Sequence, residues 1–157
     1  MEFDEVMVRY RKVATVGRSK PAPSGVDVDR AEQELGIKLP PSFVRFLRES
    51  KGKRPPFWDV LPILTGDRTD RTFDIVRAND LEHGDRANPI PAHYCTFHGT
   101  GTGDQVCFDT SSRRPDGEYQ VVLWVHDDPP LGNLNDPLTW SSFLAWLDKE
   151  VDELETE

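Results

Sequence analysis

The chain has 157 residues, of which 28 are acidic and 19 are basic, so its formal net charge is −9. This length suits one domain, and a 36% hydrophobic share with 10% aromatic residues can build its core. The acid excess argues against direct contact with a nucleic-acid backbone, and the chain has no apolar run near the roughly 20 residues that a membrane-spanning helix needs.

The charge is distributed unevenly along the chain. Residues 1–60 carry 12 basic and 9 acidic side chains, a net charge of +3, whereas residues 61–157 carry 7 and 19, a net charge of −12. Such a balance favours a basic protein as the partner. Acidic residues stand near the N-terminus, where a signal peptide would carry basic residues and an apolar stretch, so we expect a cytoplasmic protein.

The first part of the sequence is predicted to be helical. Apolar residues recur at helical spacing over residues 3–14, with acids early and bases late, as the helix dipole favours. After a proline-marked loop, Asp27 is a suitable N-cap for a helix over residues 28–35. Gly36 is the expected left-handed C-cap of that helix.

A third helix is predicted to begin near Pro41, because the first turn of a helix tolerates proline. Its apolar face would consist of Phe43, Phe46 and Leu47, and it should end near residues 50–52.

Five short segments then predict strands, because they are rich in β-branched and aromatic residues and are separated by Gly, Asp, Asn and Pro. They are residues 58–64, 72–76, 94–97, 105–109 and 119–126. The third and fourth should pair across a glycine-rich turn at residues 98–104. The run 121–125 is apolar without alternation, which predicts a central strand covered on both faces.

The last element is an amphipathic helix over residues 140–154, with Thr139 as its expected cap. The order of helices, then strands, then a helix predicts an α+β fold. We expect one domain over residues 1–157, with a mostly antiparallel sheet of about five strands packed by N-terminal helices and the C-terminal helix.

Two local patterns suggest ligand chemistry, and both have simpler interpretations. The glycine-rich run at residues 98–104 lacks the lysine and the following helix of a phosphate loop, so it is interpreted as a hairpin turn. A metal site could be assembled from His83, His93, His98 and His126 with Glu82, Asp127 or Asp128. Since no pair has metal-site spacing, we assign the histidines surface or capping roles and expect neither metal nor cofactor.

No catalytic residue is expected, since the chain has no G-x-S-x-G motif. Cys95 and Cys107 fall in predicted strand interiors and could lie near each other across a hairpin. In a reducing compartment we expect both to be thiols. Trp58 and Trp124 are assigned to the core.

Acidic residues cluster in loops that follow the predicted strands. The candidates for partner binding are Asp109, Asp116, Glu118, Asp127, Asp128 and Asp136. They are either ordinary solvated loop residues or a patch for a basic partner.

Several stretches of the sequence resemble the SUKH superfamily, which contains fungal cell-wall-assembly regulators and bacterial toxin-immunity proteins. Residues 28–47 resemble its opening signature, residues 97–109 its glycine-rich turn and strand, residues 121–127 a later strand, and residues 140–147 its closing helix. The matching positions in the first stretch are Glu32, Leu35-Gly36, Leu39-Pro40, Phe43 and Phe46-Leu47. The resemblance spans about residues 27–150. Residues 53–85 do not align with the family pattern, and the helix at 3–14 belongs to a part that varies within the family.

The resemblance implies a non-catalytic immunity protein that binds and neutralises a cognate toxin, for bacterial members often a basic nuclease. Acidic loops would attract the toxin, and apolar anchors would hold it. A cytosolic regulatory adaptor of the fungal type is the alternative, and a small hydrolase using His126 with Asp127 or Asp128 ranks third.

Overall fold

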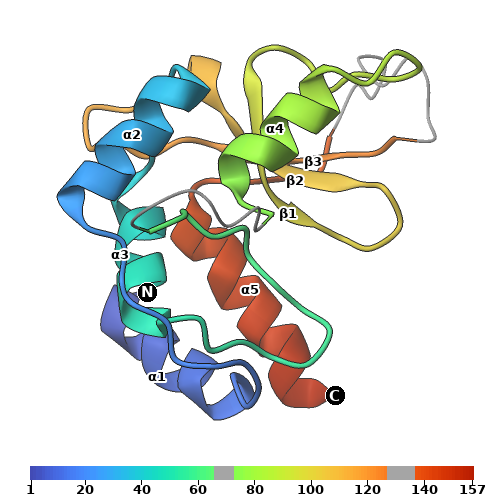
Figure 1. Cartoon of the computed structure of the whole chain (residues 1–157). Helices are drawn as coiled ribbons and strands as arrows, with labels where there is room; N and C mark the ends of the chain where they lie inside the picture. Colours follow the sequence, from blue (N-terminus) through green and yellow to red (C-terminus); the bar gives the residue numbers. More distant parts are fainter. Residues whose placement is uncertain (66–72, 127–136) are drawn as a thin grey trace.

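The computed structural model describes residues 1–65, 73–126 and 137–157 (Figure 1). These residues form an α+β fold, as predicted, although the sheet contains four strands and not five. The helices are α1 (Phe3–Val13), α2 (Gly25–Leu35), α3 (Pro41–Ser50), α4 (Ile75–His83) and α5 (Phe143–Thr156); the strands are β1 (Tyr94–Gly99), β2 (Gln105–Asp109), β3 (Val121–Trp124) and β4 (Thr139–Trp140), and a 3-10 turn, η1 (Thr110–Ser112), follows β2.

The sheet is antiparallel throughout, with its strands in chain order from β1 to β4. β1 and β2 form the predicted hairpin, whose turn contains Gly101 at φ +90° and Gly103 at φ +98°. The amide of Thr100 donates to the carbonyl of Asp104 across this turn at 3.1 Å. The glycine-rich run is therefore a hairpin turn, as the sequence indicated.

An aromatic core joins the sheet to the helices. The ring of Phe43 on α3 lies 5.3 to 6.0 Å from three rings of the sheet and α5, those of Phe97, Phe108 and Phe143. Figure 1 shows α5 running from the sheet towards α1, while α4 lies over the strands and α2 lies beside α4. β3 is covered on both faces, as predicted: Val121 belongs to the main core, and Val122 packs in a second, smaller cluster.

Helices α1 and α3 confirm the sequence predictions, and Gly36 ends α2 at φ +72°, as expected. The predicted N-cap of α2 is wrong. Ser24 caps this helix, because its hydroxyl accepts from the amide of Asp27 at 3.2 Å while the Asp27 carboxylate accepts from the amide of Ser24 at 2.8 Å. Asp27 is thus the N3 residue of a capping box and not the N-cap.

The predicted strand at residues 58–64 is absent from the structure. This segment is irregular and makes one backbone hydrogen bond to β1, from the amide of Leu61 to the carbonyl of Phe97 at 2.8 Å. The outer edge of β1 is instead occupied by Asn79 of α4, whose amide group bonds both the N–H and the C=O of Thr96 at 2.8 and 2.9 Å. The side chain of Asn79 thereby replaces a paired strand at this edge.

The strand predicted at residues 72–76 is also wrong where the structure describes it. Residues 73 and 74 lead into α4, and the carboxylate of Asp74 caps the helix by accepting from the amide of Arg77 at 2.9 Å. The β-branched Ile75 and Val76 suggested a strand, but both are buried in the first turn of this helix. Tertiary packing outweighs their intrinsic preference.

The C-terminal helix begins three residues later than predicted. Thr139 and Trp140 pair with Val122 and Val121 as β4, so Thr139 is not the cap. Ser142 caps α5, because its hydroxyl accepts from the amide of Ala145 at 3.1 Å.

Candidate partner-binding surfaces

Three of the six predicted acidic site residues lie together in the structure. Asp109 ends β2, and Asp116 and Glu118 belong to the connection between β2 and β3, residues 110–120. The other three candidates, Asp127, Asp128 and Asp136, lie outside the described residues.

Each of these three carboxylates has a local structural role. Asp109 caps η1 by accepting from the amide of Ser111 at 3.0 Å, and Asp116 accepts from the amide of Glu118 at 2.9 Å within a turn. Glu118 accepts from the amide of Ser42 at 3.0 Å, at the start of α3. Since the N-cap residue of α3 is a proline without a capping side chain, Glu118 supplies this cap from a distant part of the chain.

The same connection also carries basic side chains. The guanidinium of Arg114 lies 3.7 Å from the carboxylate of Asp116 and donates to the carbonyl of Ser141 at 2.6 Å. The exposed Arg113 follows η1 directly. The connection is therefore a surface of mixed charge, which offers less attraction to a basic partner than its acid count alone suggests.

A second group of acids lies at the end of β3, where three segments meet. We call Glu82, Asp85 and Asp104 the acidic edge. Asp104, in the hairpin turn, accepts from the amide of His126 at 3.0 Å, and its carboxylate lies 2.8 Å from Nδ1 of that ring. The side-chain amide of Asn88, three residues after Asp85, donates to the carbonyl of His126.

Two carboxylates of the acidic edge, Glu82 and Asp85, have shifted pKa values. Burial raises the pKa of Glu82, and the charge of Asp85 raises it further, while His126 and His83 oppose the shift. Asp85 itself is exposed, and its pKa is lowered by hydrogen bonds from the amides of Asn88 and Ala87. Because the acidic edge depends on α4, which the sequence did not predict, spacing alone gave no signal that would have found it.

The acidic edge is continuous along the chain with two predicted candidates. His126 directly precedes Asp127 and Asp128 in the sequence. The charged residues of this region that the structure describes are Glu82, Asp85, Asp104 and the exposed Arg86.

The expectation of surface or capping roles is wrong for His98. Only 7% of this residue is exposed, and its ring lies 5.4 Å from the ring of Trp58 and 5.2 Å from that of Trp146. Its Nδ1 contacts the carbonyl of Asp59, and burial lowers its pKa. Among the residues that the structure describes, no three His, Cys, Asp or Glu side chains converge as metal ligands.

The cysteines lie on adjacent strands, as the hairpin interpretation suggested. Cys95 pairs with Phe108 and Cys107 with Thr96, and both cysteines are free thiols. Burial raises the pKa of Cys95 to about 12 and that of Cys107 well above its usual range. Both are thus poor nucleophiles.

The fold and these surfaces define an α+β domain with charged loops around a small antiparallel sheet. The sequence matches the SMI1 / KNR4 family (SUKH-1) over residues 22–149, and the chain belongs to this family. The resemblance seen in the sequence is therefore confirmed.

A solved structure has the same fold. It is described as the crystal structure of a protein from Pseudomonas syringae pv. tomato, and it compares with this chain at a TM-score of 0.61 and 18% sequence identity. The match covers 91% of this chain and 93% of that chain. No curated protein matches the chain. None of the helices in the described ranges is long and apolar enough to cross a membrane.

Proposed function

We propose that this protein is a non-catalytic binding module of the cytoplasm that binds and neutralises a cognate bacterial toxin. Membership of the SUKH-1 family over residues 22–149 carries the proposal. The superfamily that the sequence resembles includes bacterial toxin-immunity proteins, and that resemblance implies the same role here. The net charge of −12 after residue 60 favours a basic toxin, such as a nuclease.

The acidic edge is the surface that suits this role best among the described residues. Asp85 is exposed, Glu82 and Asp104 are half-buried, and the chain continues from His126 into Asp127 and Asp128. Carboxylates gathered in this way attract a basic surface over a distance of about one Debye length, roughly 10 Å at 0.1 M salt. They would accelerate association, after which apolar contacts hold the complex.

The proposal includes no catalysis, and the burial and contacts of the cysteines and of two histidines support this. Cys95 and Cys107 are buried with raised thiol pKa values. His98 packs between two tryptophans in the core, and His126 is held by Asp104.

Co-expression tests the proposal directly. The product of the adjacent upstream gene, expressed alone, should arrest growth; co-expression with this protein should restore growth, and the two should co-purify. Failure of both rescue and complex formation would contradict the immunity role.

The acidic edge can be tested in the same complex by reversing its charge. Glu82→Lys with Asp85→Lys should lower the association rate constant about tenfold at low salt, and the difference from wild type should shrink as salt is added. Glu2→Lys with Glu5→Lys is the matched control, since it makes the same charge change on exposed positions of the N-terminal segment and α1. Equal effects of the two pairs would remove the acidic edge from the interface.

The same reversal at Asp127 and Asp128 tests the two candidates outside the described residues. We expect a slower association that depends less on salt, with circular dichroism showing an unchanged fold.

A further inference from the structure

Two loops that are far apart in the sequence are paired by backbone hydrogen bonds, and both belong to the net-basic residues 1–60. The amide of Val16 donates to the carbonyl of Arg54 and the amide of Arg54 to the carbonyl of Val16, both at 3.0 Å. The amide of Lys20 donates to the carbonyl of Lys51 at 2.7 Å. These bonds hold the segment after α1 against the segment after α3.

Two glycines make this close approach possible. Gly17 has φ +94° and Gly52 has φ +80°, backbone conformations that side chains disfavour. A Cβ atom on Gly17 would lie 2.5 Å from the carbonyl oxygen of Gly52, which is closer than any real contact. The pairing of the two loops therefore depends on glycine at positions 17 and 52.

The paired loops carry five cations, which we call the basic loop surface; Phe57 follows Arg54 further along the second loop. The cations are Arg18, Lys20, Lys51, Lys53 and Arg54. None of them makes an ion pair with a carboxylate within the described part of the chain. Lys53 donates to the carbonyl of Gly17 at 2.8 Å, so its ammonium is held in place by the backbone. The acidic Asp59 also faces this surface; burial raises its pKa, and the charges of Arg54 and Lys20 oppose that shift.

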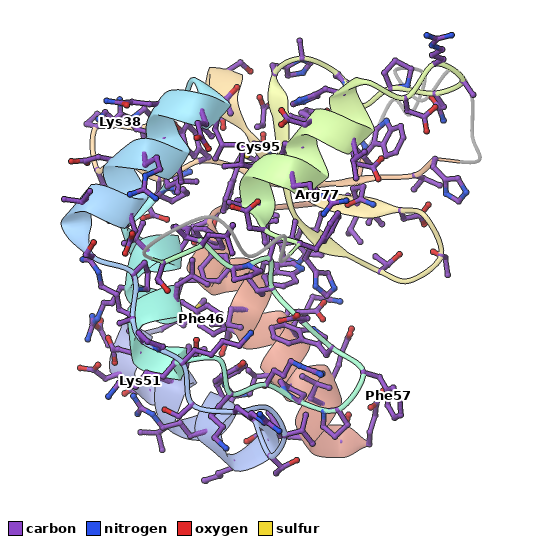
Figure 2. The ribbon with its side chains drawn as sticks, viewed as in Figure 1. Lys38, Phe46, Lys51, Phe57, Arg77 and Cys95 are labelled. Atoms are coloured by element: carbon purple, nitrogen blue, oxygen red, sulfur yellow. The ribbon has the colours of Figure 1, made fainter. Side chains whose placement is uncertain are left out.

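Phe57 stands at the bend of the second loop, and it is the most exposed apolar residue described, at 105% relative exposure. Figure 2 shows its side chain pointing away from the body of the molecule. Its φ of +59° is a rare conformation for a bulky residue. The next residue, Trp58, points inward and donates from Nε1 to the carboxylate of Glu150 at 3.0 Å, which fixes the base of the bend.

A pocket of about 250 Å³ lies beside the paired loops. Lys20, Lys53 and Arg54 line its charged side, together with Asp59. Its apolar lining comes from Tyr10, Phe46, Val60, Pro62 and Ile63. The hydroxyl of Tyr10 donates to the carbonyl of Lys53 at 2.7 Å and so joins the lining to the basic loop.

We propose that the basic loop surface is a docking site for an acidic segment of a partner protein, with an apolar side chain of that segment entering the pocket. Five cations without an ion pair, facing the single carboxylate of Asp59, favour a segment with carboxylates, and the pocket and Phe57 favour apolar side chains within it. A long phosphate backbone would be repelled by the net charge of −9, and it would leave the apolar pocket unused. The proposal is independent of toxin binding, which we assign to the acidic edge.

A titration with defined peptides tests this site. Isotope-labelled full-length protein is titrated with short synthetic peptides in which glutamates flank leucine or phenylalanine, and amide shifts are followed by NMR. We expect shifts at residues 16–20 and 51–58. Peptides with lysine in place of glutamate, or with serine in place of the apolar residue, should bind at least about tenfold more weakly.

Variants locate the contact and separate it from folding. Lys51→Glu with Lys53→Glu should weaken binding about tenfold or more, whereas Arg86→Glu with Arg113→Glu, the same charge change on exposed positions elsewhere, should not. Phe57→Ala should weaken binding about fivefold without lowering the melting temperature, because this side chain is fully exposed.

Several outcomes would overturn the proposal. These are no shift at residues 16–20 and 51–58 at millimolar peptide, unchanged binding by Phe57→Ala, or equal binding of the lysine peptides. A single-stranded oligonucleotide or an anionic phospholipid vesicle that shifts these amides where the peptides do not would assign the surface to another class of ligand. A dimer that Phe57→Ala dissociates in sedimentation would assign it to a second copy of the chain.

Discussion

The face between α1 and α5 and the basic loop surface handle their cations in opposite ways. On the first, Arg9 lies 2.7 Å from the carboxylate of Asp148 and 3.0 Å from that of Glu155, and it also pairs with Asp152. One cation near the N-terminus thus engages three acids of the last helix. On the second, five cations share a surface without an ion pair to any described carboxylate.

The difference teaches that net charge along a sequence is not the charge available to a partner. The division into +3 before residue 60 and −12 after it is real, but Arg9 bridges the two halves. Likewise Glu118, from the acidic half, caps α3 in the basic half. Charges that the fold leaves without an ion pair remain available to a partner, and five of them lie together on the paired loops, whereas Asp104 of the acidic edge is paired with His126.

The loop pairing should be the more fragile of the two arrangements. Gly17→Ala would place a Cβ atom against the carbonyl of Gly52 in a disfavoured backbone conformation, and we expect it to lower the free energy of unfolding by about 2–3 kcal/mol. Gly25→Ala, where nothing lies within 4 Å of the new atom, is the control and should be neutral or stabilising. Urea denaturation measures both; equal stability of the two variants would show that the loops are not tightly paired.

Lowering the pH from 7 to 5 should destabilise the packing of His98 against Trp58 and Asp59, which follow the second of the paired loops. The ion pairs between α1 and α5 should be largely unaffected over this range. Burial lowers the pKa of His98, partly offset by its contact with Asp59 and by Glu150. The unfolded chain therefore binds a proton more readily, so the contribution of neutral His98 is complete above about pH 6.5 and is lost as the pH falls below it, by up to about 1.4 kcal/mol per pH unit.

This pH effect can be isolated by comparing wild type with His98→Asn, whose side-chain amide can still donate to the carbonyl of Asp59. The difference in unfolding free energy between the two proteins should decrease from pH 7 to pH 5. A difference that stays constant over this range would mean that His98 does not titrate in this window.

Removing the cation of the paired face should have a smaller effect. Arg9→Ala leaves three carboxylates on α5 without their partner, and we expect a loss of about 1 kcal/mol at low salt. The loss should largely disappear in 1 M salt, where the Debye length is about 3 Å. Lys149→Ala, which removes a single exposed pair with Glu153, is the control and should cost at most about half as much.

The smallest expected effect is an increase in stability. Phe57→Gly removes both the disfavoured φ of +59° and an exposed ring, so the variant should be as stable as wild type or more stable by up to about 1 kcal/mol. The same variant should bind acidic peptides more weakly. A clear loss of stability in thermal denaturation would show instead that Phe57 supports the fold.

Much of the fold could be predicted from the sequence where local signals agree. The helices at α1 and α3, the left-handed Gly36, the hairpin turn and the doubly covered β3 follow from periodicity, proline and glycine positions and apolar runs. The failures share a cause. Residues 58–64 and 75–76 have strand-like composition, but the edge of β1 is occupied by Asn79, a contact across 17 positions that composition cannot show.

The candidate surfaces were less predictable than the fold. Asp109, Asp116 and Glu118 were recognisable as acidic loop residues, but their use as caps depends on partners such as Ser42, distant in the sequence. The acidic edge required α4, and the basic loop surface required the pairing of two segments that are distant in the sequence, such as Val16 with Arg54 and Lys20 with Lys51.

By itself, the sequence determined the α+β class, the family and the charge balance. It also determined the helices whose ends are marked by glycine or proline, because these features depend on neighbours along the chain. Only the tertiary structure decided which charges are neutralised and which are available, because an ion pair or a cap depends on distance in space. It therefore placed Arg9 among the acids of α5 and left the lysines and arginines of the paired loops without an ion pair to a described carboxylate.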